Sequence, residues 1–185
     1  EEVTVSAIRV SNKSSVAHSD IKEQAIKSNN AARNVPALLQ TLPSVVAYTE
    51  GGTPVGNTNF RIRGTDANRI NMTLNGMPLN NPETQEVYWV NLPDISNSLK
   101  SIQVQRGVGS ATAGTASFGG NISMQTVGAR SKPYAEISNS FGQYNTYLGS
   151  VATGTGIMKN GLSLDARYSY TKSDGYIRNA KVDHK

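Results

Sequence analysis

The stretch of sequence that decides the fold runs Ser101-Ile-Gln-Val-Gln-Arg-Gly-Val-Gly-Ser-Ala-Thr-Ala-Gly-Thr-Ala-Ser-Phe-Gly-Gly-Asn-Ile-Ser-Met-Gln-Thr126. It begins with an alternating strand that places Ile102 and Val104 on one face, and a second alternating strand covers residues 121–125. Between the strands, residues 109–120 are almost wholly Gly, Ala, Ser and Thr. Because small residues let backbone approach backbone and glycine tolerates positive φ, we expect this segment to be wedged against other protein.

The composition indicates a protein of strands and small polar connections. Of the 185 residues, 37% are hydrophobic and only 17% are charged, whereas disordered chains carry more charge. The absence of cysteine excludes disulfides and thiolate metal sites, and no run of eighteen apolar residues predicts a transmembrane helix. The net charge of +5 comes from scattered single charges, which argues against a nucleic-acid partner.

The beginning of the chain has two interpretations. Residues 1–7 alternate apolar and polar side chains, which fits either a short first strand or an extended peptide that adds to the sheet edge of a partner. Residues 11–32 are polar and weakly patterned, so we expect a flexible tether there.

The clearest helix signal follows this tether. Val35, Leu38, Leu39 and Leu42 have helical spacing, with Asn34 as a candidate cap, Pro36 in the first turn and Pro43 after the end. Short strands are expected at residues 45–48, 60–63 and 70–74, and the pair Asn75-Gly76 predicts a hairpin turn. A short helical segment is expected between Pro93 and residue 102.

Two loops of more than ten residues, 49–59 and 79–91, interrupt these elements. Loops of that length in a compact domain are usually functional or disordered. The second loop carries Tyr88 and the only tryptophan, Trp89, beside carboxylates and amides. This aromatic pair either binds a polar ligand or packs the loop against the core.

The pattern changes after residue 127. Residues 134–141, 146–154 and 162–171 form three alternating segments of eight to ten residues, and a tight turn at 159–161 separates the last two. This length and alternation fit the wall of an outer-membrane barrel, although soluble antiparallel sheets alternate in the same way. Three strands cannot close a barrel, so we expect the chain to be part of a longer protein.

No catalytic motif is present. His18 and His184 lie at opposite ends of the chain, and the glycines at 107 and 109 match neither the dinucleotide-binding pattern nor the P-loop. The carboxylates are dispersed, so no metal site is expected. The sequence therefore predicts a protein that is not an enzyme and holds no resident cofactor.

Four ordered motifs over about seventy residues resemble the plug of TonB-dependent outer-membrane receptors: Phe60-Arg-Ile-Arg-Gly64, Leu74-Asn-Gly-Met-Pro78, Ile102-x-Val-x-Arg-Gly107 and Gly114 to Asn121. The resemblance implies an α+β plug domain, with a short mixed β-sheet and small helices, followed by the first antiparallel strands of an outer-membrane β-barrel. The corresponding division is a TonB-binding segment (Ton box) and flexible tether at 1–29, a plug at 30–128, and the start of the barrel at 129–185. The implied location is the outer membrane of a Gram-negative bacterium.

The resemblance also implies partners and site residues. The partners are the energising protein TonB, outer-membrane lipid and a small-molecule ligand; a ferric siderophore is favoured, with haem or cobalamin as other metal chelates. The TonB-binding residues would be Glu1, Glu2, Val3, Thr4, Val5, Ser6 and Ala7. The ligand-binding residues on the apical loops would be Tyr48, Glu50, Asn80, Asn81, Gln85, Tyr88 and Trp89. The residues pairing with carboxylates of the barrel wall would be Arg61, Arg63 and Arg106, which would otherwise be solvated surface arginines.

A different class of protein fits the same strands and loops. A soluble α+β periplasmic binding or signalling module would pack residues 134–171 into its own core, so that Tyr168 and Tyr170 would be buried. The two interpretations therefore differ in which face of the last strands is exposed.

Overall fold

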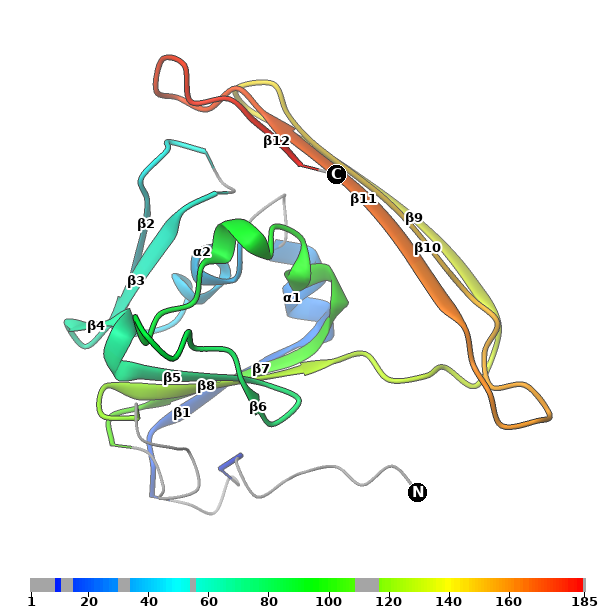
Figure 1. The fold of residues 1–185 in the computed structure, drawn as a ribbon, viewed down its shortest axis with the longest axis horizontal. Helices are drawn as coiled ribbons and strands as arrows, with labels where there is room; N and C mark the ends of the chain where they lie inside the picture. The colour runs from blue at the N-terminus through cyan, green and yellow to red at the C-terminus, as the bar shows by residue number, and fades with distance from the viewer. Residues whose placement is uncertain (1–8, 11–14, 30–33, 54–55, 109–116, 185) are drawn as a thin grey trace.

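The computed structural model describes residues 9–10, 15–29, 34–53, 56–108 and 117–184. Two parts are evident in Figure 1: an N-terminal body of short strands and helices, and a long sheet that arches beside it. We refer to the second part, a four-stranded sheet of order β12-β11-β10-β9, as the wall sheet. The helices α1 and α2 lie between the main sheet of the body and the wall sheet.

The main sheet of the N-terminal body has five strands in the order β1-β7-β8-β5-β6. Its only parallel pair among the described residues is β5 with β8. The strands are β1 (His18–Lys22), β5 (Ile70–Leu74), β6 (Met77–Pro78), β7 (Leu99–Arg106) and β8 (Gly120–Thr126). A second, antiparallel sheet contains β2 (Val45–Thr49), β3 (Thr58–Ile62) and β4 (Thr65–Asp66). The helices are α1 (Glu23–Asn29), α2 (Val35–Leu39) and the 3₁₀ turns η2 (Ala67–Arg69), η3 (Trp89–Asn91) and η4 (Ile95–Ser98).

The two strands predicted from residues 101–126 form the centre of the main sheet. Ile102 pairs with Met124 and Val104 with Ile122, and all four side chains are fully buried. The opposite face of β7 is covered as well, since Gln103 is only 3% exposed. The small-residue segment between the strands can be assessed only at residues 117–120, because 109–116 lie outside the described residues.

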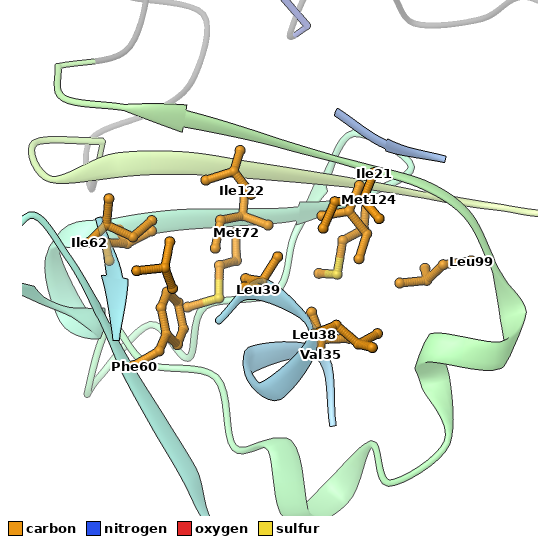
Figure 2. Close-up of a cluster of buried hydrophobic side chains, with 14 of the residues drawn as sticks. Ile21, Val35, Leu38, Leu39, Phe60, Ile62, Met72, Leu99, Ile122 and Met124 are labelled. Atoms are coloured by element: carbon orange, nitrogen blue, oxygen red, sulfur yellow. The ribbon is translucent and has the colours of Figure 1, made fainter. Parts of the chain in front are cut away.

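The predicted helix packs its apolar face onto this sheet. Val35, Leu38 and Leu39 of α2 are buried; in Figure 2 Leu39 lies beside Met72, and Val35 and Leu38 lie on the side of Met124 and Leu99. Each such buried side chain contributes roughly 1.5–3 kcal/mol before the entropy of ordering is subtracted. The helix ends at Leu39, earlier than predicted, and the following residues form turns, because a residue that precedes proline disfavours helical geometry.

The expectation of a flexible tether through residue 29 is wrong for residues 18–29. Strand β1 pairs with the edge of β7, from His18 opposite Gln105 to Lys22 opposite Ser101. Helix α1 then buries Ile26, which is 1% exposed, while Ile21 of β1 is 8% exposed. Two isolated apolar residues give no clear period in the sequence, and the segment is held by main-chain pairing with β7 together with the burial of Ile21 and Ile26.

The glycine turn after β5 is confirmed. Asn75 and Gly76 both have positive φ, 50° and 84°, as a type I′ turn requires, and β5 pairs with β6 across it. Strands β3 and β5 belong to different sheets, and η2 turns the chain between them.

The wall sheet agrees with the predicted long strands and adds a short fourth one. Its strands are β9 (Tyr134–Gly142), β10 (Thr146–Gly154), β11 (Asp165–Ser173) and β12 (Val182–His184). Ile137, Phe141 and Tyr168 are 75%, 81% and 61% exposed, whereas Leu148 and Thr171 on the opposite face are each 2% exposed. The exposed apolar side chains Ile137, Phe141 and Tyr168 therefore point away from the N-terminal body. None of the helices in the described residues combines the length and hydrophobicity that crossing a membrane requires.

Candidate functional site

A pocket of about 580 Å³ lies between the loop that joins β2 to β3 and the start of β12. We name it the loop pocket. Its lining includes Glu50 and Asn57 from the first loop, Val90 from η3, Lys181 just before β12 and Asp183 within β12. The pocket thus joins charged and amide side chains from both parts of the molecule, a combination suited to a polar ligand.

The loop pocket is held in place by contacts on both sides. The carboxylate of Glu50 accepts a hydrogen bond of 2.7 Å from the Asn59 side chain. The Tyr176 backbone N–H donates to the Gly52 carbonyl at 3.0 Å, which fixes the β11–β12 loop on the β2–β3 loop. Gly52 has φ of 67°, and a Cβ there would lie 2.6 Å from the Ile177 side chain, so only glycine fits beneath this loop.

The predicted ligand-binding residues do not share one location. Glu50 lines the loop pocket, and Tyr48 is 48% exposed on β2. Tyr88 is 43% exposed, and its hydroxyl donates to Thr84 Oγ1 at 3.2 Å. Neither tyrosine lines the loop pocket, so Glu50 is the member of the predicted set that the structure places in it.

Asn80 and Asn81 shape the 79–91 loop from within. The side chain of Asn80 accepts from the Met72 N–H at 2.7 Å and donates to the carbonyls of Ile70 and Gln85. Asn81 Oδ1 accepts from the N–H groups of the two residues after Pro82, at 2.8 and 3.2 Å. Their amides therefore replace regular backbone pairing in this loop.

Gln85 takes part in the same local network. Its backbone has φ of 59°, and its side chain donates to the Pro82 carbonyl at 2.9 Å. Direct ligand contact by Gln85 would compete with this bond, and the role assigned to it stays a prediction.

Trp89 is the residue of this set whose predicted ligand-binding role the structure contradicts. Its indole is 2% exposed and belongs to the hydrophobic core of the N-terminal body. A side chain so enclosed has no surface to offer a ligand, so packing is the interpretation that the structure supports. The sequence could not separate the two roles, because the apolar neighbours come from distant segments.

Two of the three predicted anchoring arginines, Arg61 and Arg106, bond within the N-terminal body, and Arg63 lies against it. Arg61 Nε lies 2.7 Å from Asp66 Oδ1, and Arg106 donates to Ser19 Oγ at 2.8 Å. The Arg63 guanidinium lies against Gly107, 3.3 Å from where a Cβ would stand. Within the described residues no wall carboxylate forms an ion pair with them, and their pairing with a barrel wall stays a prediction.

A contact between body and wall sheet does exist, and sequence reasoning missed it. Arg167 of β11 forms an ion pair with Asp94 just before η4 and donates to Ser98 Oγ at 3.1 Å. The side chains of Arg167 and Asp94 are 22% and 13% exposed. The available signal was an arginine at an inward-facing position of an alternating strand, where a charge needs a partner.

The predicted TonB-binding residues 1–7 lie outside the described residues, but the chain just after them is held. Arg9 donates to the side chain and the carbonyl of both Ser101 and Ser123, at 2.8–3.2 Å. The side-chain amide of Gln103 pairs with the backbone N–H and carbonyl of Val10, at 2.7 and 3.0 Å. Burial lowers the pKa of the Arg9 guanidinium, and Asp20 partly offsets this effect.

Comparison with known proteins identifies the fold. The sequence matches the family described as TonB-dependent Receptor Plug Domain over residues 10–121. This chain belongs to that family. The N-terminal body is the plug, and the wall sheet corresponds to the first strands of the receptor barrel, which is the fold class predicted from the sequence motifs. Receptors of this family are Gram-negative outer-membrane proteins, and the predicted location is confirmed.

Similar proteins illustrate the range of the family. The haemoglobin and haemoglobin-haptoglobin-binding protein A of Haemophilus influenzae is 27% identical over 147 residues, covering 71% of this chain and 13% of the relative. The siderophore receptor PiuA of Acinetobacter baumannii superposes with a TM-score of 0.65 at 22% identity, over 85% of this chain and 21% of PiuA. The copper transporter OprC has a TM-score of 0.64 at 16% identity, over 90% of this chain and 25% of OprC.

The chain therefore spans only an eighth to a quarter of the length of these relatives. The family is one of receptors and transporters rather than of enzymes, and its members bind small-molecule ligands such as siderophores. The alternative of a soluble periplasmic module is set aside, since the apolar face of the wall sheet points outward instead of into a core.

Proposed function

We propose that this chain is the plug and first wall strands of a receptor that imports a scarce nutrient across the outer membrane, with energy from TonB. The loop pocket is the observation that carries the proposal. There the plug loop with Glu50 and the wall segment with Lys181 and Asp183 converge on a space of small-ligand size. A polar ligand held by both parts could report its presence to the plug.

The ligand we favour is a ferric siderophore or another metal chelate, such as haem or cobalamin. The names of the similar proteins support this class, because they refer to haemoglobin, siderophores and copper. The chain contributes binding and gating rather than catalysis. The described residues include no cluster of three or more potential metal ligands among His, Cys, Asp and Glu.

The TonB-binding segment is proposed to be residues 1–7, directly ahead of the Arg9 contacts. The plug would then extend from about residue 15 to residue 128, and the wall from residue 129 onward. A peptide that adds a strand to the sheet of TonB resists pulling well, because its ladder hydrogen bonds load together. The Arg9 contacts would carry that load into β7 and β8.

Uptake by cells that express the receptor containing this chain tests the proposal. A panel of iron chelates, haem and cobalamin should include at least one compound whose import depends on both the receptor and TonB. A matched experiment uses Val5→Pro, which removes a ladder donor and should abolish import while surface binding persists. Import of no compound in the panel would contradict the proposed ligand class, and full import by Val5→Pro would place the TonB-binding segment elsewhere.

A further inference from the structure

The segment that joins β10 to β11, residues 155–164, exposes four large apolar side chains. Ile157, Met158, Leu162 and Leu164 are 53%, 40%, 63% and 68% exposed. We name this segment the apolar turn. In Figure 1 it lies at the end of the wall sheet where the connection from β8 arrives. The loop pocket is at the opposite end, because β12 pairs with the last residues of β11.

The apolar turn is ordered by its own hydrogen bonds. The Thr155 N–H donates to the Leu164 carbonyl at 2.9 Å, and the Leu164 N–H donates to Thr155 Oγ1 at 3.0 Å. Nearer the tip, the Met158 N–H donates to the Leu162 carbonyl at 2.8 Å. The segment thus has a fixed shape although its apolar side chains are not packed against the rest of the chain. A contiguous apolar surface of this kind indicates contact with another apolar phase or partner.

The apolar turn continues the outward face of the wall sheet. The bonds between Thr155 and Leu164 extend the β10–β11 pairing by one step beyond Gly154 opposite Asp165. By alternation Leu164 therefore lies on the same face as Tyr168, the face on which the wall sheet exposes its apolar side chains. In an outer-membrane barrel this face contacts lipid. The apolar turn is thus a continuation of the lipid-facing surface beyond the ends of the strands.

The length of the strands places the apolar turn at a membrane interface. Strands β9, β10 and β11 have nine residues each. At about 3.3 Å per residue and a tilt of about 40°, they span about 23 Å, close to the apolar band of about 25 Å in such barrels. Toward the other end of the strands, the rings of Phe141, Tyr147 and Tyr170 form a row with centroids 5.1 and 6.2 Å apart. Aromatic rows mark one interface of a barrel, so the turn lies at the other.

The charges at this end suit the headgroups of phospholipids. Lys159, at the tip of the turn, and Lys132, in the adjacent connection, are both exposed. The connection lies against the turn, since a Cβ at Gly156 would be 2.6 Å from the Lys132 carbonyl carbon. The carboxylates of the neighbouring strands, Glu136 and Asp165, instead line a cavity of about 560 Å³ between the wall sheet and the plug. The two lysines can therefore meet lipid phosphates while their stems lie on apolar surface.

We propose that the apolar turn is a membrane anchor. Its apolar side chains lie at the boundary of headgroups and acyl chains in the periplasmic phospholipid leaflet, and Lys159 and Lys132 contact headgroup phosphates. Only the choice of leaflet rests on the proposed function, in which the loop pocket faces outside. The Ile157 N–H donates to the Arg130 carbonyl at 2.9 Å, so the anchored turn also holds the connection between plug and wall.

Depth-dependent fluorescence quenching in the reconstituted receptor tests the anchor. This chain has no cysteine, so Leu162→Cys places a bimane label on the apolar side of the turn. Ser163→Cys is the matched control, because Ser163 is exposed beside it and lines the cavity on the plug side. The vesicles contain phosphatidylethanolamine, phosphatidylglycerol and nitroxide lipids, and iodide on both sides of the membrane is the aqueous quencher. The unsubstituted receptor gives the background from the rest of the protein.

We expect a headgroup-level nitroxide to quench the label at residue 162 several times more strongly than the label at residue 163, and iodide to show the reverse order. A label at Val151→Cys, which is 49% exposed on the outward face of β10, should respond best to a nitroxide deep in the acyl chains. Equal lipid quenching at residues 162 and 163, with strong quenching at residue 151, would overturn the anchor. If the receptor imports no compound of the uptake panel but residue 162 is quenched by lipid, the proposed function fails and the lipid contact stands.

The headgroup contact has its own test. Lys159→Glu should lower the lipid quenching at residue 162 several-fold in vesicles with phosphatidylglycerol, because an anionic surface repels the new carboxylate. The effect should be much smaller in vesicles of phosphatidylcholine alone. Lys181→Glu is the matched control, since it makes the same change at the opposite end of the wall sheet. Unchanged quenching in Lys159→Glu with both kinds of vesicle would overturn the contact between Lys159 and the headgroups.

Discussion

Trp89 has the sequence context of a ligand-binding residue, but in the structure it is a core residue. It lies at the start of η3 in an otherwise exposed loop, yet its indole is almost fully enclosed. The neighbouring Tyr88 is 43% exposed. The two aromatic residues, adjacent in sequence, therefore have different roles, and substitution separates them.

Trp89→Ala is expected to destabilise the plug by about 3–5 kcal/mol, because it removes a large buried side chain and leaves a cavity. Tyr88→Ala, the matched control, should change stability by less than about 1 kcal/mol, since surface substitutions usually have small effects. Chemical denaturation of the purified receptor measures both. A Trp89→Ala receptor with normal stability and weakened ligand affinity would restore the ligand-binding interpretation.

Glycine is required where β8 begins. A Cβ at Gly120 would lie 2.7 Å from the carbonyl oxygen of Gln105 on the paired strand β7. Gly120→Ala should therefore force the central strands apart and cost about 1–3 kcal/mol of stability, as overpacked sites do. Gly51→Ala is the control, because the nearest atom to its Cβ is 4.0 Å away. Equal melting temperatures for the two variants would show that β7 and β8 can yield at this point.

At the scale of elements, a buried amide connects helix α2 to the loop pocket. Asn34 was expected to cap the helix, but its side chain makes no cap hydrogen bond. Its Nδ2 instead donates to the Gly56 carbonyl at 2.8 Å and to Thr58 Oγ1 at 3.1 Å. Asn34 is 1% exposed, so these bonds are shielded from water. The position of the β2–β3 loop thus depends on α2.

Asn34→Asp should loosen the β2–β3 loop, because the isosteric carboxylate cannot donate either hydrogen bond. We expect faster amide hydrogen exchange at residues 56–60 and an overall loss of about 1–3 kcal/mol for the unpaired buried groups. Asn91→Asp is the control, since it makes the same change at an exposed position outside this loop. Hydrogen exchange measured by mass spectrometry would contradict the link if residues 56–60 kept their protection in Asn34→Asp.

At the scale of the whole molecule, few hydrogen bonds and ion pairs join the plug to the wall sheet in the described part of the chain. Arg167 bonds to Asp94 and Ser98 near η4, while Tyr176 bonds to Gly52 beside the loop pocket. The plug core itself belongs to the N-terminal body alone. Because the plug core contains no residue of the wall sheet, the contacts between plug and wall can break without loss of the plug core.

Charge reversal tests the first of these attachments. Asp94→Arg or Arg167→Asp alone places like charges together and should destabilise the plug–wall contact by about 1–2 kcal/mol, less than for a fully buried pair. The double variant restores opposite charges and should recover much of the loss. Thermal unfolding of the detergent-solubilised receptor measures the cycle. Additive losses in the double variant would mean that the two side chains do not interact.

The sequence by itself determined the local elements with strong patterns. Alternation predicted β7, β8 and the long wall strands, helical spacing predicted α2, and Asn75-Gly76 predicted the hairpin. These signals depend only on neighbours in the chain, so they can be recognised without knowledge of the fold. The ordered motifs between Phe60 and Asn121 added the family, whose plug model matches residues 10–121.

Only the tertiary structure decided which side chains meet. It placed β1 on the edge of β7, buried Trp89, turned Asn34 away from its helix, and brought Arg167 of the wall to Asp94 of the plug. Each of these outcomes depends on residues far apart in the sequence, whose approach costs chain entropy that only the assembled core repays. Local sequence patterns contain no information about that balance. Only the folded chain therefore shows which distant residues come together to line a pocket.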